Sequence, residues 1–368
     1  MGETKTSTAR SEAVPSSVGG TVFLGIAAGL GALIALPRIH HSPSLLFAFT
    51  LVIVLALTGL IWQRVRAGAA LQCQVIVRKP HVIQTLVQSG VFIYWGSAWT
   101  PVYEQAPLII AQVCVAYLCE AIISWRRFGM WRLGLGPFPV VLSTNLFLWF
   151  IDDYFVYQFA MIALAYWSRD VLCTVREGRR AHIFNPSAFA LGVAAIAILV
   201  LQVPDLTHGQ MIAQTLGSPE YPYVWIFLMG FIVQAFFKVT FVTMSAAITM
   251  VLLGYVYTAV FGTYYYVDTS IPIAVFLGMN LLVTDPATSP SSMVGRCVFG
   301  ILYGALVFVS YDLLRDVELV SVISGQRIEI AWLDKLLCVP LLNLLAQPIQ
   351  RWVGAWDRHL LETSWLRL

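Results

Sequence analysis

Two short polar blocks interrupt an otherwise apolar sequence, and they hold the residues best suited to chemistry. The first block is the run His-Ile-Phe-Asn-Pro-Ser, which contains Asn185, Pro186 and Ser187. Proline disfavours helix at the preceding residue and suits the first helical turn, so Asn185 is placed to cap a helix that begins at Pro186. The free backbone donors of such a helix start attract anionic or carbonyl-rich ligands, although an ordinary capped helix has the same pattern.

The second block combines a carboxylate with hydroxyl groups and a proline: Thr284, Asp285, Pro286 and Thr288. A carboxylate at the margin of a membrane is costly unless it is paired with a cation or caps backbone donors. Arg296, which follows in the same segment, is one candidate partner for Asp285. Farther on, Gly300 and Gly304 form a small-residue pair that lets neighbouring helices approach closely.

The composition indicates that these blocks belong to a membrane protein. Of the 368 residues, 59% are hydrophobic and 11% are charged, and the mean hydropathy is +0.78, whereas soluble domains have about 25% charged residues. The formal net charge of +3 is spread over short loops, so nucleic acid is not an expected partner. The lipid bilayer is the expected surrounding.

Apolar stretches near the length of a bilayer crossing recur along nearly the whole chain. They lie at about 20–36, 44–62, 81–98, 104–124, 136–151, 154–168, 187–203, 222–237, 240–262, 271–283, 297–314 and 331–347. Because a transmembrane helix needs about 20 residues, the sequence predicts an all-α fold, a polytopic integral membrane helical bundle with about ten to twelve transmembrane segments. The stretches 187–203 and 271–283 adjoin Asn-Pro and Asp-Pro steps, so we expect broken or half helices there, or tilted segments whose irregular ends are buried in protein.

The chain divides into three parts. Residues 1–18 are polar and rich in Ser and Thr, which predicts a disordered cytoplasmic tail. Residues 19–350 form the transmembrane helical domain. Residues 351–368 carry three tryptophans among arginines, which suits an amphipathic segment at the membrane interface, with a solvated tail as the alternative.

Every second loop is rich in basic residues, and this alternation predicts the orientation of the bundle. Lys and Arg gather at 64–79, 126–132 and 169–180, while the intervening loops hold almost no positive charge. Because such residues stay in the cytoplasm, we expect the N- and C-termini to be cytoplasmic.

The cysteines and histidines of the sequence are poorly placed to bind a metal ion or a haem. The six cysteines include no Cys-x-x-Cys, and most lie in or beside apolar runs, where a thiol behaves as a small hydrophobe. The six histidines lie at helix ends or in loops, so few could grip a haem inside the bundle. We therefore expect no metal site. Glu120, inside an apolar run, is the best isolated candidate for an ion or proton contact.

The two blocks, in this order, resemble the membrane subunits RnfD and NqrB of ion-translocating electron-transport complexes. The likeness covers roughly residues 137–314. It also includes a small-residue stretch at 139–146, with Ser143 and Thr144, and the glycine-spaced helix after the second block. The residue sequence of the first block is most similar to that of stand-alone RnfD-like proteins.

This resemblance implies a bacterial inner-membrane bundle, related to the urea-transporter fold, that passes electrons with a bound flavin. It also implies other membrane or peripheral redox subunits as partners. By the same resemblance, the following residues line or cap the cofactor cavity: Ser143, Thr144, Asn185, Pro186, Ser187, Thr284, Asp285, Pro286 and Thr288.

One departure from the family concerns the attachment of the flavin. Family members hold flavin mononucleotide (FMN) through a threonine in a Ser-Gly-Ala-Thr motif, on the outer loop after the Phe-Asn-Pro helix. The equivalent loop, residues 203–219, lacks that motif and offers only Thr207 and Thr215. We therefore expect a flavin (FMN or riboflavin) bound non-covalently, or a quinone, and no covalent FMN.

Two other functions fit the same residues. A solute transporter or channel that has lost the redox cofactor would use the two blocks to line a path at broken helices. A scaffold subunit that only docks other membrane proteins would need no ligand at all.

Overall fold

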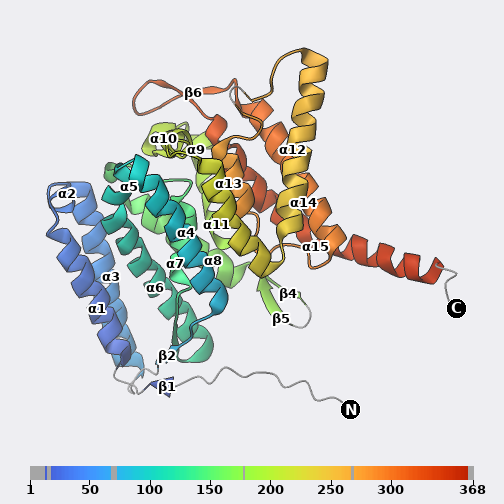
Figure 1. Ribbon diagram of the computed structural model, residues 1–368. Helices are drawn as coiled ribbons and strands as arrows, with labels where there is room; N and C mark the ends of the chain where they lie inside the picture. The colour runs from blue at the N-terminus through green and yellow to red at the C-terminus, as the bar shows by residue number, and fades with distance from the viewer. Residues whose placement is uncertain (1–12, 15–17, 68–72, 177–178, 267–268, 364–368) are drawn as a thin grey trace.

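The computed structural model describes residues 13–14, 18–67, 73–176, 179–266 and 269–363, and most of them are helical (Figure 1). Within these residues, four helical segments are long and apolar enough to cross a membrane: Pro43–Trp62, Ala106–Phe128, Thr240–Phe261 and Met293–Leu314. Shorter apolar helices lie at Val22–Ile34, Pro186–Leu201 and Pro222–Phe237. The helical character is confirmed, and the larger number of crossings stays a prediction.

An N-terminal hairpin stands at one side of the bundle (Figure 1). It is built from α1 (Val18–Ile34), α2 (Pro37–His40) and α3 (Pro43–Ala67). Helix α1 packs along α3 and also touches α6 (Ala106–Phe128). At the tip of the hairpin, Arg38 forms an ion pair of 2.8 Å with Asp152 in the short helix η1 (Asp152–Tyr154). This pair joins the hairpin to the rest of the bundle.

The remaining helices form two successive series with the same order of long and short members. The first series is α4 (Lys79–Ala98), α6, α7 (Pro137–Asn145), α8 (Val156–Val171) and α9 (Pro186–Leu201). The second is α11 (Pro222–Phe237), α12 (Thr240–Phe261), α13 (Ile273–Leu281), α14 (Met293–Leu314) and α15 (Asp334–Thr363). The third helix of each series, α7 or α13, has only nine residues.

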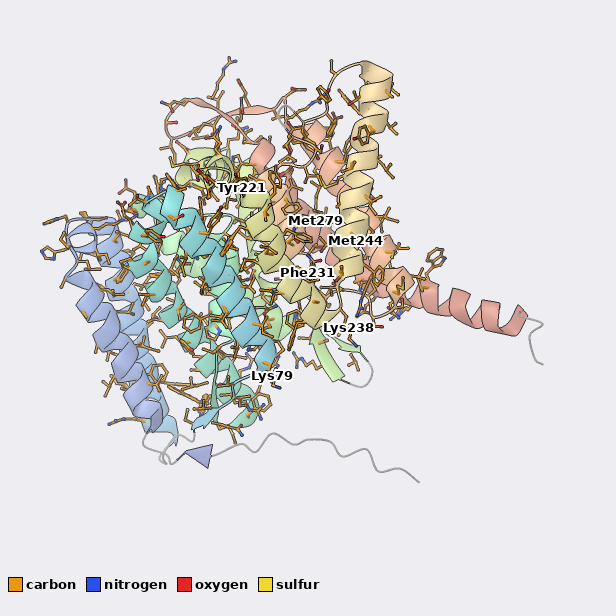
Figure 2. All side chains as sticks on the ribbon, viewed as in Figure 1. Lys79, Tyr221, Phe231, Lys238, Met244 and Met279 are labelled. Carbon is orange, nitrogen blue, oxygen red and sulfur yellow. The ribbon has the colours of Figure 1, made fainter. Side chains whose placement is uncertain are left out.

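Matching helices of the two series make matching contacts. Helix α4 packs on α7 as α11 packs on α13, and α8 packs on α9 as α14 packs on α15. Contacts of α4 with α11 and of α9 with α15 join the series. The series run in opposite directions, because α4 begins at the end of the bundle marked by Lys79, whereas α11 runs from Tyr221 at the other end down to Lys238 (Figure 2). The bundle therefore consists of two inverted halves.

A buried amide network explains why α7 ends after nine residues. The side chains of Gln112 and Asn145 exchange hydrogen bonds of 3.1 and 2.6 Å, and Gln158 donates to Gln112 Oε1 at 3.2 Å. Gln158 Oε1 then accepts from the backbone N–H of Phe150 at 3.1 Å, which satisfies a donor of the non-helical segment that follows. Only the first part of the apolar stretch 136–151 is therefore helical, because side chains supply hydrogen bonds to the backbone beyond Asn145.

The other proline-flanked stretches behave differently from each other. Helix α13 is short, as expected for 271–283. Helix α9 is an unbroken helix of 16 residues, and the half helix or tilted segment expected over 187–203 stays a prediction. The shortest helix of the first series is α7.

Short strands and short helices lie at the ends of the bundle. Because of the strands, the fold is not purely α-helical. One sheet joins β1 (Ala13–Val14), β2 (Cys73–Val75) and β3 (Trp131–Leu133), and two hairpins join β4 (Cys173–Arg176) to β5 (Arg179–His182) and β6 (Glu318–Val320) to β7 (Arg327–Glu329). The short helices are α5 (Pro101–Glu104), α10 (Gly209–Thr215), η2 (Pro204–Leu206) and η3 (Ala331–Leu333). In the β4–β5 hairpin, Cys173 lies opposite His182, which sets the position of that histidine.

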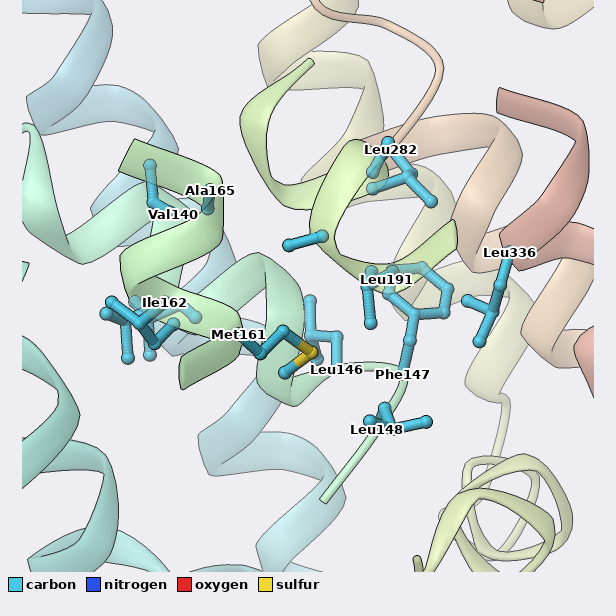
Figure 3. Packing of buried hydrophobic residues seen from close by; sticks show 14 of the residues in the cluster. Val140, Leu146, Phe147, Leu148, Met161, Ile162, Ala165, Leu191, Leu282 and Leu336 are labelled. Atoms are coloured by element: carbon cyan, nitrogen blue, oxygen red, sulfur yellow. The ribbon is translucent and has the colours of Figure 1, made fainter. Parts of the chain in front are cut away.

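The core lies where the two halves meet. Side chains from α8, α9 and α15 meet residues that follow α7 and α13 (Figure 3). Those labelled there include Leu146, Met161, Leu191, Leu282 and Leu336. Helices α12 and α14 approach closely at Gly300, where an added Cβ would collide with the carbonyl oxygen of Val242. The packing role predicted for the glycine pair is thus confirmed.

The two ends of the chain are described only in part. Of residues 1–18, the structure describes Ala13, Val14 and Val18, and the rest of the predicted tail lies outside the described residues. Helix α15 continues to Thr363 and projects away from the bundle (Figure 1). The interfacial position of 351–368 stays a prediction, and the side chains beyond Gly354 lie outside the described residues.

Candidate functional site

Asn185 joins the two polar blocks at one end of the bundle. This end, which carries Lys79 and Lys238, is called the basic end below (Figure 2). The Asn185 side chain accepts hydrogen bonds from the N–H groups of Ser187 and Ala188 at 3.1 and 3.3 Å and so caps α9. Its Nδ2 donates to the carbonyl oxygen of Leu282, at the end of α13, at 2.9 Å. The cap predicted from the Asn-Pro step is confirmed, and it also binds the second block.

The same asparagine contacts a third helix through its backbone. Its N–H donates to Asn343 Oδ1 of α15 at 2.9 Å. Nearby, Ser187 Oγ donates to the carbonyl oxygen of Val140 in α7 at 3.2 Å. The start of α9 is therefore fixed by polar contacts to α7, α13 and α15 at once.

Asp285 lies beside His182 and accepts a hydrogen bond from its Nε2 over 3.3 Å. The carboxylate also accepts from the N–H of Ala287 at 3.1 Å and from the hydroxyl of Thr288 at 3.3 Å. Burial by itself would raise the pKa of Asp285, but these bonds, that from His182 foremost, favour the charged form and lower the pKa below its usual value.

The predicted partner of Asp285 was wrong. Arg296 donates to the backbone carbonyl oxygens of Pro290 and Lys238 at 3.1 and 2.6 Å. It thereby fixes the start of α14 against the end of α11 and does not form an ion pair with Asp285. His182, the last residue of β5, reaches the carboxylate because β5 leads directly into the Asn-Pro step.

Around these contacts lies an inner cavity of about 130 Å³. Six of the predicted site residues line it: Ser143, Asn185, Pro186, Ser187, Thr284 and Asp285. Three others do not line it. Thr144 is fully buried and donates to carbonyl oxygens of its own helix. The Thr288 hydroxyl donates to Asp285 Oδ2, and Pro286 lies between these two residues in the loop.

Helix α4 supplies cavity residues that sequence reasoning missed. Three polar side chains of this helix line the inner cavity: His81, Gln84 and Gln88. Gln88 is 95% buried, and its Oε1 has no hydrogen-bond partner among the described residues. Such an acceptor is costly to bury unless a ligand or water satisfies it. The four-residue spacing of Gln84 and Gln88 on an apolar helix was the available signal, since it places both on one face.

A larger vestibule of about 700 Å³ adjoins the inner cavity at the basic end. The two share the lining residues His81, Gly136, Arg169 and His182. Five arginines line the vestibule, namely Arg78, Arg127, Arg132, Arg169 and Arg180, against two carboxylates, Glu120 and Asp170. The basic loops of the sequence therefore converge on one concave surface.

Glu120 and Arg169 form an ion pair of 3.2 Å where the cavity meets the vestibule. The glutamate is thus paired, and the ion or proton contact expected for it stays a prediction. Its Oε2 nevertheless has no hydrogen-bond partner among the described residues. The pair places one fixed cation, Arg169, on the wall of both cavities.

A second cavity, of about 740 Å³, opens at the opposite end of the bundle. It is lined at the starts of α11, α13 and α15, which are the inverted counterparts of α4, α7 and α9 at the inner cavity. A buried pair, Asp334 and Lys335, separated by 3.3 Å, lies there at the start of α15. Cavities therefore open at both ends of the bundle.

The two threonines of the loop 203–219 form hydrogen bonds within that loop. Thr207 donates to the carbonyl oxygen of Pro204 at 3.3 Å, and Thr215 donates to that of Met211 at 2.8 Å. Within the described residues, no three His, Cys, Asp or Glu side chains are grouped in a way that could hold a metal ion. The inner cavity and the vestibule, where the polar blocks and the arginines converge, are the candidate functional site.

Comparison of the chain with models of known protein families gave no match, and comparison with curated proteins gave none either.

Proposed function

We propose that the chain is a polytopic membrane subunit that transfers electrons and binds a flavin non-covalently at the inner cavity, as its resemblance to RnfD and NqrB implies. The convergence of the two polar blocks carries this proposal. Asn185 bonds to the end of α13, and His182 pairs with Asp285, so residues far apart in the sequence surround one polar cavity. By the distribution of basic residues, the basic end faces the cytoplasm.

The chemistry of the lining residues suits the polar edge of a flavin ring. That edge presents carbonyl oxygens and an N–H group in alternation, which need donors and acceptors at fixed positions. Gln88 offers an unsatisfied acceptor, and Gln84, Ser143 and Ser187 add amide and hydroxyl groups. The carbonyl oxygens of a quinone would use the donors alone, which makes a quinone the alternative ligand.

The sizes of the two cavities favour a different part of the ligand in each. Small-molecule sites measure about 300–1,000 Å³, so the inner cavity of about 130 Å³ holds one ring edge and the vestibule of about 700 Å³ holds the remainder. A bound flavin would supply the one- and two-electron chemistry, while this chain positions it and tunes its potential through charge and hydrogen bonds. Electron donor and acceptor would reside on other membrane or peripheral redox subunits.

The direct test is spectroscopic. The protein is purified in detergent, and its visible absorption and fluorescence are recorded before and after acid precipitation. We expect a flavin spectrum, with the flavin released by acid because it is not covalently attached. A folded, colourless protein that also fails to bind added FMN or riboflavin would sink the proposal.

Variants then locate the flavin. Gln88→Leu removes the unsatisfied acceptor, and Asp285→Ala removes the carboxylate, so both should weaken flavin retention. Gln210→Leu, in the cavity at the opposite end, serves as the matched control and should retain the flavin. Equal retention by all three variants would remove the inner cavity as the site.

One observation favours solute transport as a second candidate function. The inverted halves place one cavity at each end of the bundle, with a short helix, α7 or α13, reaching each of them. Secondary transporters use inverted repeats with discontinuous helices in this way. Uptake of small neutral solutes into liposomes tests this candidate, and the absence of flux in liposomes with correctly folded protein would contradict it.

A further inference from the structure

The vestibule at the basic end has more positive charge than its carboxylates neutralise. Arg127 forms an ion pair with Asp170, and Arg169 pairs with Glu120 at 3.2 Å. Among the described residues, no carboxylate lies within ion-pair distance of the other three arginines, Arg78, Arg132 and Arg180. Five guanidinium groups therefore line the vestibule against two carboxylates, and Arg78, Arg132 and Arg180 lie outside the close ion pairs.

Two of these arginines are held in place by their surroundings. The Arg132 guanidinium lies over the ring of Phe128, 3.5 Å from its centroid, and its Nε is buried without a hydrogen-bond partner among the described residues. Arg180 donates to the backbone carbonyl oxygen of Asp170 at 2.5 Å. Because contacts to a ring face and to a carbonyl oxygen leave the positive charge uncompensated, both groups stay available to an anion.

We propose that Arg78, Arg132 and Arg180 bind a phosphate monoester in the vestibule, so that the flavin of this site is FMN and not riboflavin. This inference rests on the proposed flavin site. Guanidinium groups match the geometry of phosphate oxygens with paired N–H donors. With the ring edge in the inner cavity, the ribityl chain and phosphate of FMN would extend into the vestibule, where the three arginines lie.

Arginines at the cytoplasmic edge of a membrane protein also serve orientation alone, and Arg126 illustrates that role. It is a neighbour of Arg127 in sequence and lies 3.9 Å from Asp170 Oδ2, but its side chain is 76% exposed and does not line the vestibule. The arginines of the vestibule differ from it because they face a cavity that adjoins the polar blocks. Arg126 therefore supplies a matched control with the same change of charge at the same end.

The test compares FMN with riboflavin, which differ only in the phosphate, on the purified full chain in phosphatidylcholine nanodiscs. Quenching of flavin fluorescence gives a dissociation constant for each. We expect FMN to bind at least about tenfold more tightly than riboflavin, and this preference to fall as NaCl is raised, because salt screens ionic attraction. Equal affinities would overturn the proposal and leave the flavin site standing. Binding of neither flavin would overturn the proposed function itself.

Variants assign the preference to the vestibule. Arg132→Gln and Arg180→Gln should each lower the preference for FMN about tenfold and leave riboflavin binding unchanged. Arg126→Gln should behave like the wild type, and Arg132→Lys, which keeps the charge, should retain most of the preference if the site is intact. A preference that survives both glutamine changes, or that is lost in Arg126→Gln, would contradict the assignment.

A final arm separates FMN from a lipid headgroup, which carries the same phosphate chemistry. The binding measurements are repeated in nanodiscs that contain phosphatidylglycerol. A preference for FMN that persists there supports the proposal. A preference that disappears would assign the arginines to lipid phosphate and overturn it.

Discussion

His182 Nε2 lies 3.3 Å from Asp285 Oδ2, although 103 residues separate the two in the sequence. His182 ends the β4–β5 hairpin that leads into α9, and Asp285 follows α13, so this contact joins the first half of the bundle to the second. The carboxylate also caps its own loop through Ala287 and Thr288. One side chain therefore links local turn structure to the packing of the two inverted halves.

Replacing Asp285 by Ala should destabilise the fold by about 2–3 kcal/mol, because three hydrogen bonds to a partly buried carboxylate are lost. Unfolding in mixed micelles with an increasing fraction of a denaturing detergent measures the change in the free energy of unfolding. Asp316→Ala, an exposed carboxylate beyond the end of α14, should leave unfolding unchanged. Equal effects of the two substitutions would show that the His182 contact contributes nothing.

The acid sensitivity of the fold should follow the lowered pKa of Asp285. A carboxyl group whose pKa is lower in the folded than in the unfolded state stabilises the fold above the unfolded value, here 3.8, and loses that contribution as the pH falls through the folded value. The difference between the melting temperatures of the wild type and of Asp285→Asn should therefore stay constant from pH 7 to about 5. The difference should vanish only below 3.8. A difference that vanished between pH 6 and 5 would contradict this.

Asn185→Ala should cost more stability than the loss of an ordinary helix cap. The substitution removes the cap of α9, worth about 1 kcal/mol, and also the bond to Leu282. Ser292→Ala is the comparison, because Ser292 caps α14 through Gly295 alone. We expect the Asn185 variant to unfold first in a thermal scan, and the reverse order would argue against its joining role.

Gly300→Ala should destabilise the protein by about 1–3 kcal/mol, because the added methyl group would force α12 and α14 apart at Val242. Gly254, on α12, has nothing within 4 Å of an added Cβ. Gly254→Ala should therefore be neutral or stabilising, since alanine favours helix over glycine. Melting temperatures in detergent measure both changes, and similar melting temperatures would refute the close approach.

Two buried glutamines should respond in opposite ways to replacement by leucine. Gln88 Oε1 has no partner within the described part of the chain, so Gln88→Leu should leave stability unchanged or raise it while weakening ligand binding. Gln112→Leu strands the buried amides of Asn145 and Gln158 and should cost about 2–4 kcal/mol. Unfolding curves and flavin titrations of both variants separate the two roles. Loss of stability in both would make Gln88 a structural residue.

Much of the local structure could be predicted from the sequence because its causes are local. The Asn-Pro step predicted the capped start of α9, and the glycine pair predicted a close helix contact; both are found. The length of α7 could not be predicted, since the network that ends it joins Gln112, Asn145 and Gln158 from different elements. A run of apolar residues does not predict such a network.

The candidate site divides in the same way. The two blocks contain six of the sixteen residues that line the inner cavity, and they could be found because proline and polar residues near an apolar run are conspicuous. Arg296 was the wrong partner for Asp285, since proximity in sequence is a poor guide to contact when a hairpin from the other half reaches the same point. Gln84 and Gln88 were overlooked because their helix carries no comparable block.

The sequence by itself determined that this protein is helical and rich in apolar segments, because hydropathy and backbone preferences act over one or two helical turns. Only the tertiary structure decided that the two blocks meet and that arginines from separate loops converge on one vestibule. The packing of the two inverted halves brings these groups together, and packing depends on the complementarity of whole helix faces. The chemistry of His182 and Asp285 was visible in the chain, but their contact belongs to the fold.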